Sequence, residues 1–128
     1  MMSLLLDSHV LLWTLVEDDR VPHTLSQEIA DPRNAVHVSA ATIWELGIKA
    51  ADGRLGFDHD LVEYCEGVGF ALLPIRVEDC VRATRLPIGR HRDPFDRMLV
   101  AQAQGRGLTL VTADHELDDY DVDVIAVP

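Results

Sequence analysis

Cysteine and lysine are both scarce in this chain of 128 residues, which has two cysteines, Cys65 and Cys80, and a single lysine, Lys49. Two cysteines are too few for a disulfide framework, and neither has the spacing of a metal ligand. We interpret both as small buried hydrophobic residues of a reduced protein, which favours the cytoplasm over secretion. A chain of this length fits a single domain, residues 1–128, with a core large enough to fold without a disulfide or metal staple.

Long hydrophobic runs are also missing. No apolar stretch approaches the roughly 20 residues that span a bilayer. The first residues, 1–7, lack a basic region, and Asp7 ends their short apolar run. This pattern argues against a signal peptide, so we expect a soluble cytoplasmic protein with no membrane association. Hydrophobic residues make up 48% of the chain, an ordinary globular share that argues against disorder.

Positive charge is in deficit, because the net charge is −11. Such a chain does not bind nucleic acid through its whole surface. The charge is nevertheless polarised: seven of the 11 lysines and arginines are arginines between positions 76 and 106, whereas six acids and no lysine or arginine lie between Asp114 and Asp123. Arginine suits bidentate phosphate contacts. A solvated charged surface is the alternative interpretation of the same pattern.

Short apolar runs alternate with helix-like segments along the chain. The expected strands cover residues 3–6, 35–38, 70–74, 108–112 and 122–127. The expected helices cover residues 10–16, a segment capped by Thr24 or Ser26, residues 39–51, 58–68 and 77–86, and a segment that Asp93 and Pro94 open and that Gly105 and Gly107 end after about Gln104. Apolar strands separated by helices predict a parallel sheet with helices on both faces. In such sheets the ligand crevice lies at the carboxyl ends of the strands.

Acidic residues recur where strands end or helices begin. Asp7 directly follows the first expected strand, and Asp114 comes shortly after the strand at 108–112. Glu45 lies in an apolar part of the helix that follows the second strand, and Asp93 and Asp96 share a face at the start of a later helix. Each acid alone could be a cap, a turn residue or an exposed side chain. Four acids converging on one sheet edge indicate a site.

Carboxylates that pack together repel one another, so a cluster that stays ionised at neutral pH needs a cation. All-oxygen ligands suit Mg²⁺ or Mn²⁺, whereas no Cys or His pair shows the spacing of a zinc site. A metal held in this way can orient an attacking water and offset charge on a phosphodiester transition state. The acids therefore predict metal-dependent hydrolysis without a nucleophilic side chain.

Four sequence blocks carry a family resemblance. They are LLLDSHVLLW at 4–13, VSAATIWELGIK at 38–49, HRDPFDRMLVAQA at 91–103 and LTLVTAD at 108–114. In this order, and over nearly the whole chain, they resemble the PIN-domain family, and small stand-alone PIN domains resemble VapC-type toxins of type II toxin–antitoxin systems. The resemblance implies a three-layer α/β/α fold with a parallel sheet of about five strands in the order 3-2-1-4-5. It also implies a Mg²⁺- or Mn²⁺-dependent endoribonuclease that hydrolyses RNA phosphodiester bonds, is inhibited by a cognate VapB-type antitoxin and usually forms a homodimer.

The same resemblance assigns roles to individual acids. Asp7, Glu45, Asp96 and Asp114 match the family acids that hold the metal and carry catalysis, with Asp114 the outermost of the four. Asp93 is an additional acid, which we interpret as a helix cap or as a residue behind the metal ligands. No family acid is missing, so nothing suggests an inactive copy.

Three further residues are candidates at the same site. Thr112 matches a hydroxyl position that helps at the metal or the phosphate in the family. Arg92 and Arg97 flank the third block, and we expect them to hold the RNA backbone beside the acids. Ion pairing within the acid cluster is the alternative role for both arginines.

Two other functions compete with a nuclease. A phosphoryl receiver or phosphatase also places aspartates at strand ends, but it needs an acid pair after the first strand and a late lysine. Here Asp7 is followed by Ser8 and His9, and Lys49 lies mid-chain. A non-enzymatic binding module is the second alternative, and RNA cleavage measured with Mn²⁺ and with excess EDTA distinguishes it from a nuclease.

Overall fold

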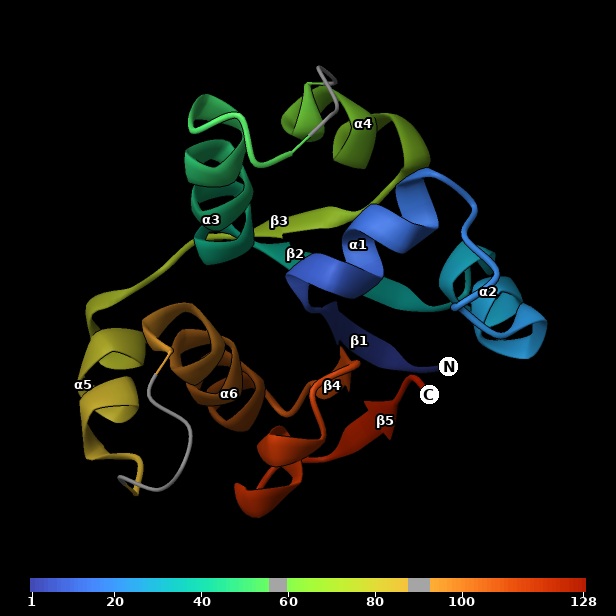
Figure 1. Ribbon diagram of the computed structural model, residues 1–128. Helices are drawn as coiled ribbons and strands as arrows, with labels where there is room; N and C mark the ends of the chain where they lie inside the picture. Colours follow the sequence, from blue (N-terminus) through green and yellow to red (C-terminus); the bar gives the residue numbers. More distant parts are fainter. Residues whose placement is uncertain (56–59, 88–92) are drawn as a thin grey trace.

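The computed structural model describes residues 1–55, 60–87 and 93–128, in which helices and strands alternate (Figure 1). In chain order the elements are β1 (Ser3–Leu6), α1 (Ser8–Leu15), α2 (His23–Ala30), β2 (Ala35–Ser39), α3 (Ala40–Ala51), α4 (Leu61–Val68), β3 (Ala71–Leu73), α5 (Val77–Arg85), α6 (Pro94–Arg106), β4 (Thr109–Thr112), the 3₁₀ helix η1 (His115–Asp119) and β5 (Val124–Ala126).

The strands form one parallel sheet in the order β3-β2-β1-β4-β5, which confirms the expected 3-2-1-4-5 order. β1 lies at the centre and is covered on both faces, because Leu4, Leu5 and Leu6 are all 0% exposed. Leu4 and Leu6 pack into one half of the core, and Leu5 packs into the other. This alternation follows from the two-residue period of a strand, and burial on both faces explains why the segment is continuously apolar.

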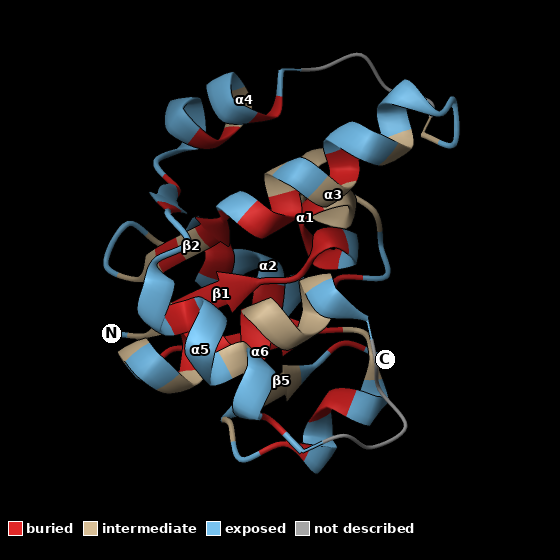
Figure 2. Cartoon of the chain, turned by 90° about the vertical axis from the view of Figure 1, so that its left-hand side faces the viewer, coloured by how far each residue is buried: buried red, intermediate tan, exposed pale blue. Residues whose placement is uncertain are grey.

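The two halves of the core define three layers. Residues of α1, α2, α3 and α4 pack on the face of Leu4 and Leu6, whereas residues of α6 and η1 pack on the face of Leu5. Helix α5 lies against α6 (Figure 1). Figure 2 shows that the buried residues concentrate in the sheet and on the helix faces turned toward it. The architecture is therefore the expected three-layer α/β/α fold. No helix within the described ranges has the length and apolar character needed to cross a membrane.

Local expectations differ from the structure in several places. Helix α2 begins at His23 with Pro22 in the cap position and no side-chain cap bond, so neither Thr24 nor Ser26 caps it. Proline pre-sets the backbone for a helix start, which explains how the helix begins without a capping hydroxyl. Helix α6 continues through Gly105 and ends at Gly107, whose φ of +65° is the left-handed conformation that glycine adopts without strain. The fourth helix was expected to start at residue 58, which lies outside the described residues. In the structure α4 begins at Leu61, and Asp60 caps it.

Candidate functional site

Asp7 is the residue that joins the central strand to the first helix. Its side chain is 3% exposed, and its Oδ1 accepts a hydrogen bond of 2.8 Å from the backbone N–H of Val10, which caps α1. Its Oδ2 accepts a bond of 2.5 Å from the Thr112 hydroxyl and a longer one, 3.3 Å, from the N–H of Ala113. Because β1 and β4 are neighbours, the ends of both strands hold this one carboxylate.

Burial raises the pKa of Asp7 above its ordinary value, and the bonds from Thr112 and Val10 offset only part of that effect. Within the described ranges no lysine or arginine pairs with this carboxylate. His9 is the nearby group whose charge lowers this pKa, and it too offsets only part of the burial. A desolvated carboxylate of this kind gains stability as an anion when a cation binds nearby. The chemistry of Asp7 therefore fits a hard divalent ion.

Thr112 and Asp114 lie at the end of β4, next to Asp7. The Thr112 hydroxyl donates to Asp7 and accepts a bond of 3.0 Å from the backbone N–H of Asp114. The Asp114 carboxylate in turn accepts a bond of 3.0 Å from the N–H of Glu116 and caps η1. The first and fourth sequence blocks thus meet through one buried hydroxyl, and Asp114 forms the outer end of this chain of bonds.

Glu45 lies on α3, and its side chain is 12% exposed rather than solvated. Its Oε2 is 3.2 Å from Nζ of Lys49, one helical turn further along. The sequence analysis missed this partner. The signal was available, because a glutamate four residues before a lysine is a favourable pair on a helix and the chain has only one lysine.

Asp93 and Asp96 both lie at the start of α6, in different roles. The Asp93 carboxylate accepts bonds from the N–H groups of Phe95 (2.8 Å) and Asp96 (3.2 Å), so its expected role as a cap is confirmed. Asp96 is half-buried in the first turn. The ring of Phe95 meets that of Trp44 edge-on at 5.1 Å. This contact joins α6 to α3 through the residues directly beside Asp96 and Glu45.

The structure thus places the expected acids in two separate pairs rather than in one shell of metal ligands. Asp7 and Asp114 meet at the ends of β1 and β4, and Glu45 and Asp96 lie on two helices in mutual contact. Within residues 1–55, 60–87 and 93–128, no three acidic, histidine or cysteine side chains are arranged to hold an ion together. Asp7, Glu45 and Asp114 instead accept bonds from Thr112, Lys49 and backbone N–H groups. Mutual repulsion of carboxylates favours such partners where no cation bridges them.

The two arginines expected to hold RNA have different outcomes. Arg92 lies outside the described residues. Arg97 donates to the carbonyls of Ala83 (2.9 Å), Leu86 (2.9 Å) and Pro87 (3.0 Å) and to the Tyr120 hydroxyl (3.3 Å), through both terminal nitrogens. Its guanidinium is therefore engaged in holding the end of α5 against α6. This placement does not support the expected RNA contact, nor the alternative of an ion pair inside the acid cluster.

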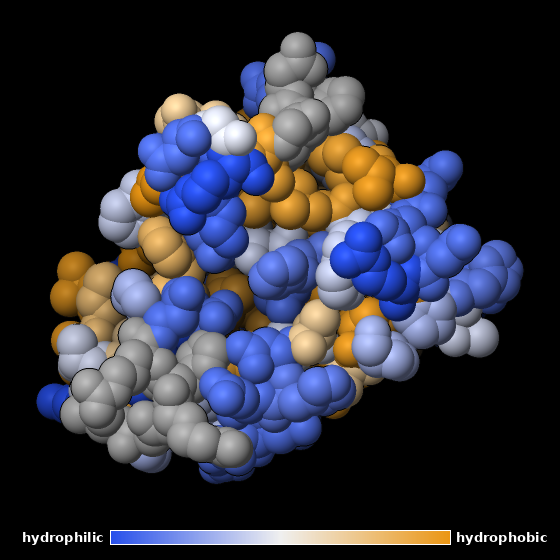
Figure 3. All heavy atoms as spheres, viewed as in Figure 1, coloured by the Kyte–Doolittle hydropathy of each residue, from blue (hydrophilic) through white to orange (hydrophobic). Residues whose placement is uncertain are grey.

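The surface around these residues is mixed in polarity. In the view of Figure 3, hydrophilic side chains cover the centre of the face, and hydrophobic surface forms a band across its upper part and a smaller area at its left edge, beside the start of α5. Val77, which begins α5, is 79% exposed, and Trp44 on α3 is 64% exposed. Apolar side chains this exposed are typical of surfaces that bind a partner.

A parallel sheet in the order 3-2-1-4-5, with acids at the carboxyl end of its central strand and on the helices beside it, defines the PIN class of α/β proteins. The family model of the PIN domain matches residues 4–123. The chain therefore belongs to the PIN-domain family.

Individual relatives narrow this placement. The chain is 30% identical over 122 residues to Ribonuclease VapC22 of Mycobacterium tuberculosis (strain ATCC 25618 / H37Rv), covering 94% of this chain and 93% of the relative. Among solved structures, a toxin–antitoxin complex from Klebsiella pneumoniae has a TM-score of 0.69 at 19% identity and covers 97% of both chains. VapBC2 from Rickettsia felis, bound to a DNA fragment from its promoter, has a TM-score of 0.68 at 11% identity, covering 99% of this chain and 100% of that one. These structural matches concern the fold.

Proposed function

We propose that this single-domain chain is the ribonuclease toxin of a VapBC-type toxin–antitoxin pair, an endoribonuclease that hydrolyses RNA phosphodiester bonds with Mg²⁺ or Mn²⁺. The observation that carries the proposal is the buried Asp7 carboxylate, which the ends of β1 and β4 hold through Thr112 at the carboxyl edge of the sheet. Membership of the PIN-domain family and the similarity to a ribonuclease support the reaction class.

The proposed metal ligands are Asp7, Glu45 and Asp96, with Asp114 as the outermost acid. Oxygen ligands from aspartate and glutamate match the preference of Mg²⁺ and Mn²⁺. When bound, the ion would supply an activated water and charge compensation at the phosphate. Four carboxylates give a donor set of the right chemistry, and Asp7 lies in surroundings that favour a cation beside it.

The other residues act on these acids. Val10 donates to Oδ1 of Asp7, and Thr112 and Ala113 donate to Oδ2, which fixes the plane of the carboxylate and leaves Oδ1 a further lone pair. Lys49 balances the charge of the half-buried Glu45. Both interactions orient acids that would otherwise repel one another, and such partners behind metal ligands are worth about 10–100-fold in affinity or activity.

The proposed partners are an RNA substrate, a VapB-type antitoxin and a second copy of the chain. Structural relatives that are toxin–antitoxin complexes support the antitoxin. Trp44 and Ile48 are exposed apolar residues one helical turn apart on α3, and a shared apolar face of this kind supports a homodimer.

The decisive experiment compares cleavage of labelled RNA by the purified protein with Mn²⁺ and with excess EDTA. We expect cleavage only with the metal, and we expect Asp7→Asn, Glu45→Gln and Asp96→Asn each to abolish it while the circular dichroism spectrum is retained. Asp114→Asn should lose less, about 10–100-fold, because its carboxylate lies at the outer end of the bonded chain.

A matched control is Asp60→Asn, which makes the same chemical change in an exposed cap of α4 and should leave cleavage unchanged. Cleavage that is indifferent to the chelator, or absent on every RNA tested, would favour the non-enzymatic binding module. Full activity of Asp96→Asn would show that another acid of the third block is the ligand.

A further inference from the structure

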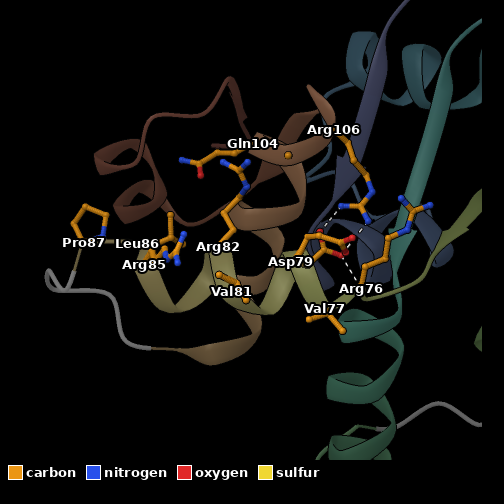
Figure 4. A pocket seen from close by; sticks show the side chains of 12 residues that line it. Arg76, Val77, Asp79, Val81, Arg82, Arg85, Leu86, Pro87, Gln104 and Arg106 are labelled. Atoms are coloured by element: carbon orange, nitrogen blue, oxygen red, sulfur yellow. Dashed lines mark hydrogen bonds and ion pairs between the residues drawn. The ribbon is translucent and has the colours of Figure 1, made fainter.

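A groove of about 890 Å³ lies between α5 and the C-terminal part of α6, on a part of the molecule that the proposed acid site does not use (Figure 4). Four of its lining residues are arginines: Arg76, Arg82, Arg85 and Arg106. In a chain with a net charge of −11, such a concentration of positive charge in one hollow calls for a physical explanation.

One of these arginines is neutralised inside the protein. Arg106 forms a two-pronged ion pair with the buried Asp79, with N–O distances of 2.5 and 2.9 Å. This bond lowers the pKa of Asp79 below its ordinary value, so the pair stays ionised at neutral pH. Arg106 and Asp79 therefore neutralise each other at one end of the groove (Figure 4), so the net charge of the groove depends on its other residues.

The other three arginines of the groove are not neutralised by any carboxylate in the part of the chain that the structure describes. Arg76, Arg82 and Arg85 are exposed, and within the described ranges no carboxylate pairs with any of them. Among the described residues that line the groove, Glu78 is the one further acid. Three cationic side chains against one free carboxylate make this hollow positive in an otherwise acidic molecule.

The Arg82 side chain lies against α6 across the groove. It reaches toward Gln104 (Figure 4), and a Cβ at Gly105 would lie at ordinary contact distance, 3.4 Å, from its Nε. The Arg82 stem therefore packs against the last turn of α6. A stem packed in this way loses less conformational entropy when its guanidinium binds an anion.

One end of the groove lies near the start of α6, the helix that carries the proposed ligand Asp96. Leu86 and Pro87 line this end, and their carbonyls accept hydrogen bonds from Arg97. Arg97 directly follows Asp96 in α6. A chain lying in the groove would therefore pass within a short distance of the first turn of α6.

We propose that this groove binds the phosphate backbone of single-stranded RNA on one side of the cleaved bond, with Arg82 and Arg85 as its main contacts. The inference rests on the proposed ribonuclease function, since it names how that enzyme holds its substrate. Guanidinium groups suit phosphate because their planar donors form paired, charge-assisted bonds. The groove carries no base-reading requirement, so its contribution is to affinity rather than to sequence specificity.

The test measures fluorescence anisotropy of labelled single-stranded RNAs of about 4 and about 16 nucleotides, without divalent ions, across a series of salt concentrations. The variant Arg82→Gln/Arg85→Gln is compared with Arg33→Gln/Arg54→Gln, which removes the same charge at exposed positions elsewhere. We expect the groove variant to bind the long RNA roughly tenfold more weakly, with a salt slope reduced by about 0.7 for each lost phosphate contact. The short RNA should be affected less, and the control should behave as the wild type.

Cleavage assays of the same proteins separate this proposal from the proposed function. If the wild type cleaves RNA and both double variants bind the long RNA equally well, the groove proposal is wrong and the nuclease stands. If no protein cleaves RNA but the long RNA still binds through Arg82 and Arg85, the groove stands and the nuclease is wrong. A groove variant that becomes monomeric while the wild type is dimeric in sedimentation would assign the groove to a second copy and overturn the RNA proposal.

Discussion

Asp7 serves the fold and the proposed chemistry with the same carboxylate. It caps α1 through Val10 and lies 3% exposed beside Thr112. The cap contributes about 1 kcal/mol, since capping side chains are typically worth this much. Burial acts in the opposite direction, because it raises the pKa of this carboxyl and so disfavours the charged form. The residue therefore costs stability at neutral pH in the absence of a cation.

This balance gives a prediction for Asp7→Asn. A group whose pKa is raised in the folded state stabilises the fold below its unfolded pKa of 3.8, and this contribution is lost as the pH rises through the folded value. We expect Asp7→Asn to unfold at higher urea concentration than the wild type at pH 7 in EDTA, with the difference shrinking toward pH 4. Asparagine caps helices as well as aspartate does, so α1 should be unaffected. Equal or lower stability of the variant at pH 7 would contradict the argument, and Asp60→Asn controls for the change of cap.

Two arginines of α6 hold α5 at its two ends. Arg97 binds the carbonyls that end α5, and Arg106 binds Asp79 near its start. The Asp79 carboxylate also accepts a bond of 2.7 Å from the N–H of Arg76, which secures the first turn. The position of α5, and with it the arginine-lined groove, therefore depends on a small number of polar bonds more than on apolar packing.

Arg97→Lys tests the attachment at the end of α5. Lysine keeps the charge but cannot reach several carbonyls with a planar fork, so we expect a loss of about 2 kcal/mol in the free energy of unfolding, measured by urea denaturation. Arg54→Lys, at an exposed position, should change stability by less than about 0.5 kcal/mol. Unchanged stability of Arg97→Lys together with weaker RNA binding would restore the RNA contact that the sequence predicted for this residue.

Asp79→Asn tests the attachment near the start of α5, through the pH dependence of the stability. Removing the carboxylate leaves Arg106 partly buried without its partner, which should cost about 2–3 kcal/mol at pH 7. Because the pKa of Asp79 is lowered in the fold, its contribution is present above 3.8 and is lost as the pH falls through the folded value. The stability difference between wild type and variant should therefore shrink in unfolding experiments below pH 4. A difference that is constant from pH 7 to pH 3 would exclude the ion pair as its cause.

At the scale of the whole molecule, the sequence predicted the sheet and its order more completely than the site. Strands buried on both faces leave a continuous apolar pattern, and the family order then fixed their neighbours. The rule that the carboxyl ends of parallel strands share one edge predicted that Asp7 and Asp114 lie together, and in the structure Thr112 joins them. The 3₁₀ helix η1 was missed because its polar, acidic sequence has no helical periodicity.

The roles of long side chains were harder to predict. Arg97 bonds to carbonyls 10, 11 and 14 positions away, and the Arg106–Asp79 pair spans 27 positions. Such contacts depend on how α5 packs on α6, which no local pattern encodes. Sequence spacing therefore identified which acids could act, whereas the packing decided which basic residues remain available for a ligand.

The proposed homodimer gives a prediction at this scale. Trp44 is 64% exposed on α3, away from the arginine-lined groove, and a charge there should oppose burial against a second copy. We expect the wild type to sediment as a dimer and Trp44→Asp to weaken the dimer at least about tenfold, equivalent to about 1.4 kcal/mol. Val68→Asp, at a residue 51% exposed on α4, is the control and should leave the dimer intact. A wild type that is monomeric at all concentrations would exclude the homodimer.

The two outer strands of the sheet, β3 and β5, are only three residues long. Edge strands this short offer few unpaired backbone N–H and C=O groups to which a strand of another chain could pair. Natural proteins use short edge strands to prevent such aggregation. Copies of this protein that accumulate in a cell are therefore expected to meet through helical surfaces and to stay out of fibrous β-assemblies. For the same reason, an insertion that lengthened β3 by a few residues would create an exposed edge to which strands of other copies could pair.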